Sequence, residues 1–181
     1  MTRVQPIADR TDHFKRLIRD VPDFPKPGIL FRDITPLLRD RHAFSAIIEQ
    51  FAQRYARKRI DVVVAIESRG FVLGAALALR LGAGLVPVRK RGKLPHKTHQ
   101  ERCTLEYGEE VLEVHQDALQ PGDRVLMMDD VLATGGTMGA AIRLAQRLQA
   151  NVIETAFLIE LTTLAGRQKL TPHAVFSLVQ Y

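Results

Sequence analysis

Apolar residues recur along the chain in two spacings, one typical of helices and one typical of buried strands. Helical spacing predicts helices at Asp12–Asp20, around Ile47–Tyr55, at Phe71–Leu81 and at Thr137–Leu148. Short runs of β-branched and other apolar residues predict strands at Asp61–Ile66, Leu85–Val88, Arg124–Met128, Val152–Ile159 and Val175–Val179. This alternation predicts an α/β fold, with a mostly parallel central sheet flanked by helices.

Two segments interrupt this pattern. Prolines and a glycine between Pro22 and Gly28 predict irregular backbone. Lys90–Arg102 is basic and lacks periodicity, which predicts a loop, and the runs Cys103–Tyr107 and Val111–His115 flank Gly108, Glu109 and Glu110, which predicts a hairpin. Because no repeat or linker divides the 181 residues, we expect a single domain over residues 1–181.

The composition is that of a globular domain with an excess of positive charge. Hydrophobic residues make up 46% of the chain and charged residues 25%, with a formal net charge of +6. Such a charge attracts polyanions, and both nucleic acids and small phosphorylated metabolites qualify. No apolar run approaches the roughly 20 residues of a membrane span, and the first dozen residues do not resemble a secretory signal. The single cysteine, Cys103, excludes an intrachain disulfide and fits a cytoplasmic protein.

The most informative segment is VLMMDDVLATGGT, at Val125–Thr137. Asp129 and Asp130 are expected beyond the carboxyl end of a strand, where open α/β sheets bind ligands. Neighbouring carboxylates suit the adjacent hydroxyls of a ribose. The Ala133-Thr134-Gly135-Gly136-Thr137 loop lets the backbone approach a ligand closely, and the following helix offers its N-terminus to a phosphate. The segment therefore predicts a ribose 5-phosphate site. It is neither a P-loop nor a dinucleotide-binding glycine motif.

This segment resembles the signature of the type I phosphoribosyltransferases, which bind phosphoribosyl pyrophosphate (PRPP). Four other segments, at Phe24–Leu38, Ala65–Phe71, Val88–Pro95 and Leu105–Gly108, resemble the adenine-specific branch of that family in order and spacing. The resemblance covers nearly the whole chain. It implies the type I fold, with a hood or base-binding region at about residues 1–36 and a mobile loop and hairpin at about residues 90–115.

The resemblance also implies a role for each matching residue. Asp129 and Asp130 would hold the ribose hydroxyls, and the loop would wrap the 5′-phosphate. The pyrophosphate site would comprise Glu67, Ser68, Arg69, Arg89 and Lys90, with a cis peptide bond at Glu67–Ser68 and the Arg89-Lys90 pair acting partly across a dimer interface. Independently of the resemblance, the guanidinium of Arg69 suits phosphate oxygens. A surface arginine at a helix start remains the alternative for Arg69, and a solvated face the alternative for the basic run.

Other segments contain the residues expected to bind the base and to act in catalysis. The resemblance implies adenine binding by Leu30, Phe31, Arg32 and Leu161, where Phe31 can stack on a purine or belong to the core. It implies catalytic roles for Glu106, Tyr107 and Arg69, in which Glu106 reaches adenine N7 while the loop excludes water. The alternative for Glu106 is a solvent-facing hairpin acid.

Together, these features imply an enzyme of purine salvage that converts adenine and PRPP to AMP and pyrophosphate. Mg²⁺ would be held mainly through substrate oxygens and water, with Asp129 as a possible contact. We expect a cytoplasmic homodimer that binds neither nucleic acid nor membrane. Two alternatives remain: a phosphoribosyltransferase specific for hypoxanthine or xanthine, and a PRPP-sensing regulator that binds nucleic acid. The segment FPKPGILFRD argues against the first, and the lack of length for an added domain argues against the second.

Overall fold

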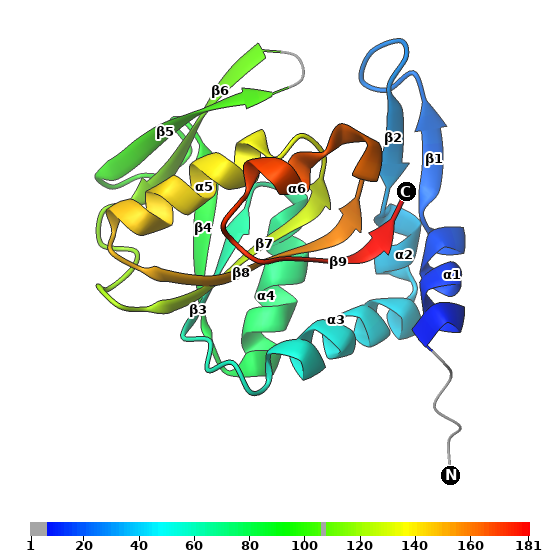
Figure 1. The fold of residues 1–181 in the computed structure, drawn as a ribbon, viewed down its shortest axis with the longest axis horizontal. Coiled ribbons are helices and arrows are strands. Elements are labelled where there is room, and N and C mark those ends of the chain that lie inside the picture. Colours follow the sequence, from blue (N-terminus) through cyan, green and yellow to red (C-terminus); the bar gives the residue numbers. More distant parts are fainter. Residues whose placement is uncertain (1–6, 106–107) are drawn as a thin grey trace. The chain divides into compact units, whose positions relative to one another are not determined.

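The computed structural model describes residues 7–105 and 108–181 and divides the chain into two compact units, Met1–Gln50 and Phe51–Tyr181. In the first unit, helix α1 (Ile7–Leu17) leads into an antiparallel pair of short strands, β1 (Arg19–Pro22) and β2 (Leu30–Asp33). Helix α2 (Thr35–Arg39) follows, and α3 (Arg41–Tyr55) begins in this unit and continues into the second (Figure 1).

The sequence prediction was incomplete for this first unit. The first helix begins and ends earlier than the predicted Asp12–Asp20, because Arg19 and Asp20 belong to strand β1. Neither β1 nor β2 was expected, since neither has an apolar run. Their pairing is reinforced by charged side chains instead: Arg32 contacts Asp20, and Arg19 Nη1 lies 3.8 Å from Asp33 Oδ2.

The second unit is built on a seven-stranded sheet with the order β5-β6-β4-β3-β7-β8-β9 (Figure 1). Strands β4 (Gly84–Lys90), β3 (Val62–Ile66), β7 (Arg124–Leu132), β8 (Asn151–Glu160) and β9 (Val175–Gln180) run parallel. Strands β5 (Thr98–Leu105) and β6 (Gly108–His115) form an antiparallel hairpin at one edge. The predicted α/β fold with a mostly parallel sheet is therefore confirmed.

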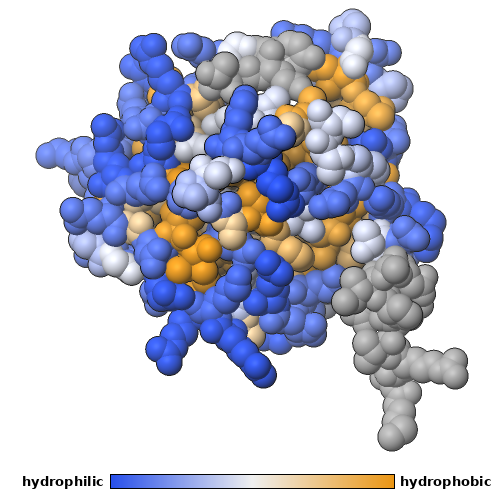
Figure 2. All heavy atoms as spheres, viewed as in Figure 1, coloured by the Kyte–Doolittle hydropathy of each residue, from blue (hydrophilic) through white to orange (hydrophobic). Residues whose placement is uncertain are grey.

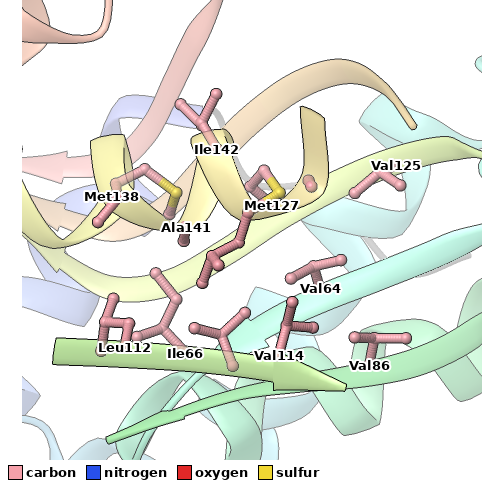
Figure 3. Close-up of a cluster of buried hydrophobic side chains, with 14 of the residues drawn as sticks. Val64, Ile66, Val86, Leu112, Val114, Val125, Met127, Met138, Ala141 and Ile142 are labelled. Carbon is pink, nitrogen blue, oxygen red and sulfur yellow. The ribbon is translucent and has the colours of Figure 1, made fainter. Parts of the chain in front are cut away.

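Helices cover both faces of this sheet. Alternate side chains of β3 point to opposite faces: Val64 and Ile66 pack in the cluster beneath α5 (Gly136–Arg147), together with Met138 and Ala141 (Figure 3). On the other face, α4 (Arg69–Leu81) approaches β3 so closely that a Cβ added at Gly74 would lie 2.5 Å from the Cβ of Ala65. A short 3₁₀ turn, η1 (Thr162–Leu164), and helix α6 (Gly166–Lys169) connect β8 to β9.

The predicted loop at Lys90–Arg102 is partly wrong, because β5 begins at Thr98. This strand has few apolar residues, with Cys103 buried at 2% exposure, and it is stabilised by pairing with β6 and by packing against α5. The hairpin itself is confirmed, but its turn is not where it was expected. Gly108, Glu109 and Glu110 lie in β6, opposite Leu105, Thr104 and Cys103.

Strand β7 extends farther than its predicted end at Met128. It continues to Leu132 because its pairing with β8 persists up to Leu132 and Glu160. Asp129 and Asp130 thus lie inside a strand rather than beyond it. On the other side of β7, however, pairing with β3 stops at Met128. Asp129 is therefore level with the last residue of β3, Ile66, and Asp130 lies past it, at the edge of the sheet that the sequence predicted for both acids.

Hydrophilic side chains dominate the face shown in Figure 2, and apolar residues appear there as separate patches. Across residues 7–105 and 108–181, no helix combines the length and apolar character that crossing a membrane requires.

Candidate active site

The candidate site in the second unit is centred on the acidic pair near the end of β7. Asp130 is buried, at 5% exposure, and Asp129 is half-buried. The Nε of Arg69, at the start of α4, lies 2.8 Å from Oδ2 of Asp130. That oxygen nevertheless receives no hydrogen bond from any residue that the structure describes. A buried carboxylate oxygen without a donor is costly, and it is suited to a hydroxyl group supplied by a ligand.

The pKa values of the two aspartates show that their negative charges are only partly stabilised by the surrounding protein. Burial, together with the charge of Asp130, raises the pKa of Asp129 well above its ordinary value. Burial also raises the pKa of Asp130, although the nearby charge of Arg69 opposes the rise. The amide of Asp130 donates to Oδ1 of Asp129 at 2.8 Å, which orients the first carboxylate. Perturbed acids of this kind are typical of functional sites.

Gly70 allows α4 to begin against this pair. A Cβ at position 70 would lie 2.9 Å from Oδ1 of Asp129 and 3.1 Å from the carbonyl oxygen of Met128. Any side chain there would push α4, and Arg69 with it, away from the carboxylates. The absence of a side chain at Gly70 therefore permits the close approach of α4 to the acidic pair.

The predicted phosphate loop, Ala133–Thr137, runs from the end of β7 into α5. Gly135 has a φ of 80°, a left-handed conformation that favours glycine, and it precedes the first residue of the helix, Gly136. Thr134 and Thr137 are half-buried at either side of the glycine pair. The backbone N–H groups and positive end of a helix such as α5 suit a phosphate group.

Glu67 and Ser68 follow β3 at the same edge of the sheet, and the expected cis peptide bond joins them. The carboxylate of Glu67 accepts hydrogen bonds from Arg89, at 3.1 and 3.2 Å, and from the backbone N–H of Lys90. The hydrogen bonds from Arg89 lower the pKa of Glu67. The ammonium of Lys90 lies 2.6 Å from Oε1 of Glu110. The structure thus brings Glu67, Arg89 and Lys90 together, with Glu67 fixing the guanidinium.

The predicted base-binding residues lie on two separate parts of the chain. In the first unit, Leu30 is 45% exposed at the start of β2, and the ring of Phe31 packs edge-on against that of Phe24 with centroids 5.0 Å apart. Arg32 contacts Asp20, as noted above. In the second unit, the N–H of Leu161 donates to the carbonyl of Leu132, which places Leu161 at the end of β7 that carries the acidic pair. Glu106 and Tyr107 lie outside the described residues.

One residue near the phosphate loop was missed by the sequence analysis. Gly166, at the start of α6, is buried, and its backbone contacts that of Ala133 and Gly135. The pattern Ala165-Gly166 after a strand looks like an ordinary turn, so nothing in the sequence connects it with residues more than twenty-five positions earlier. Only the parallel pairing of β7 and β8 brings the two turns to one edge.

The described residues do not by themselves form a complete metal-binding site. Within the part of the chain that the structure describes, no cluster of three His, Cys, Asp or Glu side chains is arranged to hold a metal ion. The acidic pair supplies oxygen ligands of the kind that Mg²⁺ prefers, but two carboxylates leave most of its positions to other ligands. The residues therefore fit a metal ion that arrives with a phosphorylated ligand and retains water.

Comparison with known proteins agrees with this arrangement of the site. Residues 37–178 match the family model of the phosphoribosyl transferase domain. An adenine phosphoribosyltransferase from Chloroflexus aurantiacus is 56% identical over 165 residues, which cover 91% of this chain and 95% of the relative. The crystal structure of the adenine phosphoribosyltransferase from Thermoanaerobacter pseudethanolicus is 48% identical, with a TM-score of 0.92 over 94% of this chain and 99% of the other.

The corresponding enzyme from Saccharomyces cerevisiae, solved in complex with an imino-altritol bisphosphate and adenine, is 40% identical with a TM-score of 0.89, over 95% of this chain and 99% of the other. The fold and the acidic site thus define a phosphoribosyltransferase. More narrowly, the chain belongs to the adenine phosphoribosyltransferase family.

Proposed function

We propose that this chain transfers the ribose 5-phosphate group of PRPP to N9 of adenine, which produces AMP and pyrophosphate. The observation that carries the proposal is the acidic pair of β7, with its buried oxygen lacking a donor, directly before the glycine loop that begins α5. The membership of the chain in the adenine phosphoribosyltransferase family supports the choice of base. So does the adenine named with the Saccharomyces cerevisiae structure.

The ribose would be held by hydroxyl groups that donate to the carboxylates of Asp129 and Asp130. This supplies the hydrogen bond that Oδ2 of Asp130 lacks. The 5′-phosphate would accept hydrogen bonds from the Ala133–Thr137 loop, which includes the first two residues of α5. These two contacts would fix the position of the ribose C1 relative to the sheet.

The reaction breaks the bond from C1 to the pyrophosphate oxygen and forms the bond from C1 to N9 of adenine, with inversion at C1. Positive charge develops on the ribose as pyrophosphate departs with the bonding electrons. Arg69, Arg89, Lys90 and the backbone at Glu67 and Ser68 would bind the departing anion, and its proximity to these cations would lower the barrier. Adenine would react as the tautomer that carries its proton on N7, which leaves the lone pair of N9 free to attack C1. Glu106 would accept the N7 proton as the bond from N9 to C1 forms, and Glu106 and Tyr107 would help to exclude water.

Mg²⁺ would be held mainly by oxygens of PRPP and by water, with Asp129 as the protein side chain that would contact it. When bound, the ion supplies charge neutralisation for the pyrophosphate oxygens. Adenine binding is the role proposed for Leu30 and Phe31, with backbone groups near Arg32 reading the edge of the base, and separately for Leu161. The predicted cytoplasmic location fits a phosphorylated substrate and a free thiol at Cys103.

We also propose a homodimer formed through α4. This helix exposes large apolar side chains beside one exposed arginine, Arg80: Leu79 is 85% exposed and Val72 44%, and Leu85 of the following strand is 44% exposed. Exposed apolar side chains that lie together are usually covered by a partner. A second copy of the same helix would cover this surface with apolar side chains of its own. Sedimentation of Leu79→Glu should give a lighter species than the wild type, and an unchanged species would exclude this surface.

The proposed activity is tested by single-turnover assays with PRPP and Mg²⁺ and with adenine, hypoxanthine, guanine or orotate in turn. We expect AMP to form much faster than any other nucleotide. A clear preference for hypoxanthine or guanine would contradict the base assignment. A gel-shift assay with duplex DNA and structured RNA at several salt concentrations tests the regulator alternative, and specific binding there would favour it.

A further inference from the structure

The backbone of Gly166 fits against the phosphate loop with no space for a side chain. A Cβ at position 166 would lie 2.1 Å from the carbonyl oxygen of Ala133 and 3.0 Å from the amide nitrogen of Gly135. The contact is reciprocal, because a Cβ at Gly135 would lie 2.6 Å from the carbonyl oxygen of Gly166. Two glycines from turns after neighbouring strands therefore meet backbone to backbone.

The turn that carries Gly166 is itself firmly anchored. Arg167, the next residue, donates to the buried carboxylate of Glu160 at 2.5 and 3.0 Å and to the carbonyl of Val175 at 2.7 Å. The hydroxyl of Thr162 donates to the backbone oxygen of Tyr181 at 2.6 Å. These bonds fix the turn to the ends of β8 and β9. The phosphate loop thus rests on a turn that is attached to β8 and β9 as well as to β7.

We propose that Gly166 is a positioning residue for the 5′-phosphate site. The inference rests on the proposed function, in which the Ala133–Thr137 loop holds that phosphate. The support at Gly166 fixes the height and direction of the loop amides, so that they point at the phosphate before it arrives. Preorganised donors of this kind bind anions without a reordering cost. A side chain at position 166 would displace the carbonyl of Ala133 and turn the neighbouring amides.

The test compares Gly166→Ala with a matched control. In Gly139→Ala, the new Cβ would meet only ordinary contacts, the nearest being Arg143 Nη1 at 3.7 Å, in the helix that follows the loop. Equilibrium binding of ribose 5-phosphate and of pyrophosphate, each with Mg²⁺, would be measured by calorimetry. The pyrophosphate site, on the turn after β3 and the end of β4, serves as the internal reference.

For Gly166→Ala, we expect ribose 5-phosphate to bind about tenfold more weakly, the effect of losing one charge-assisted hydrogen bond. Pyrophosphate binding should change less than about twofold on the same scale. The control should bind both ligands as the wild type does. Equal weakening of both ligands by Gly166→Ala would indicate a general loss of structure, and no weakening of ribose 5-phosphate binding would exclude a positioning role. Either result overturns the inference.

If Gly166→Ala fails to fold, Arg167→Ala provides the decisive measurement. It removes the anchor of the turn without adding a side chain against the loop. We expect selective weakening of ribose 5-phosphate binding by a few fold, and unchanged binding would overturn the inference. A wild-type protein that bound no ribose 5-phosphate and formed no AMP would instead contradict the proposed function. The two failures are therefore distinguishable.

Discussion

Two groups of buried acids in the second unit differ in how they are compensated. Glu154 and Glu160 on β8 are 2% and 5% exposed, and each is paired with basic side chains. Burial alone would raise the pKa of Glu154, but hydrogen bonds from Arg54 and Lys58 lower it. Hydrogen bonds from Arg167 likewise lower the pKa of Glu160. On the neighbouring strand β7, burial raises the pKa of both Asp129 and Asp130.

This difference distinguishes the glutamates of β8, which stabilise the fold, from the aspartates of β7, which we expect to bind a ligand. The glutamates accept hydrogen bonds from basic side chains, whereas Oδ2 of Asp130 has only its ion pair with Arg69 and accepts no hydrogen bond from the described residues. A protein tolerates such a group when binding later compensates it. The comparison therefore predicts opposite consequences when the charge is removed from one strand or from the other.

The largest effect is expected for Asp129→Asn. This substitution preserves shape but weakens the ribose contact, so kcat/KM for PRPP should fall by about 10- to 100-fold, as for a lost hydrogen bond to a charged group. The substitution also removes the charge of Asp129, which burial and the neighbouring charge of Asp130 make unfavourable. The ligand-free protein should therefore become more stable. The thermal midpoint would rise by about 2–4 °C for each 1 kcal/mol gained. Lower activity accompanied by lower stability would contradict the comparison.

Glu154→Gln should do the reverse. Arg54 and Lys58 lose their shared partner, and the free energy of unfolding should fall by about 1–3 kcal/mol. The side chains of Arg54 and Lys58 are 37% and 36% exposed, so water can solvate them and limit the loss. Catalysis should be unchanged when measured well below the melting temperature. A lower kcat in fully folded Glu154→Gln would place Glu154 in the active site and would contradict the distinction between the acids of β8 and those of β7.

The pH dependence of stability sharpens the same contrast. The folded-state pKa of Asp129 is raised, so its charge destabilises the ligand-free protein at neutral pH, and the cost disappears below the unfolded pKa of about 3.9. The folded-state pKa of Glu154 is lowered, so its contribution is complete above an unfolded pKa of about 4.3 and is lost as pH falls through the folded value. In thermal melts, the two variants should therefore deviate from the wild type in opposite directions at pH 7 and converge towards it in acid. Deviations that share one sign at pH 7 would refute this.

A smaller effect is expected for Glu67→Gln. It loosens the guanidinium of Arg89, and pyrophosphate affinity should fall by about 3- to 10-fold, while ribose 5-phosphate affinity stays constant. Glu101→Gln is the matched control, because Glu101 lies on the hairpin strand β5 and is ion-paired with Arg143 of α5. Binding measured by calorimetry should distinguish them, and equal effects of both variants would exclude a specific role for Glu67.

The sequence predicted the parallel strands because each carries a short apolar or β-branched run, both where the strand is mostly buried, as in β3, and where it is mostly half-buried, as in β9. The sequence prediction failed for strands that form because of pairing with a neighbouring strand and not because of their own apolar composition. β5 is polar but paired with β6, β1 and β2 are held partly by charged contacts, and β7 continues through its two acids because β8 continues beside it. The aspartates and the glycine loop could be predicted because their chemistry is local. Gly166 could not, since its role depends on contact between two distant turns.

The proposal that the acidic pair binds the ribose and the glycine loop binds the phosphate is tested most directly by a crystal structure of the complex with AMP. The account predicts the ribose hydroxyls within about 2.5–3.2 Å of the carboxylates of Asp129 and Asp130, including a donor to Oδ2 of Asp130, and the phosphate on the amides of the Ala133–Thr137 loop. AMP bound elsewhere, or bound with Oδ2 of Asp130 still lacking a donor, would contradict it.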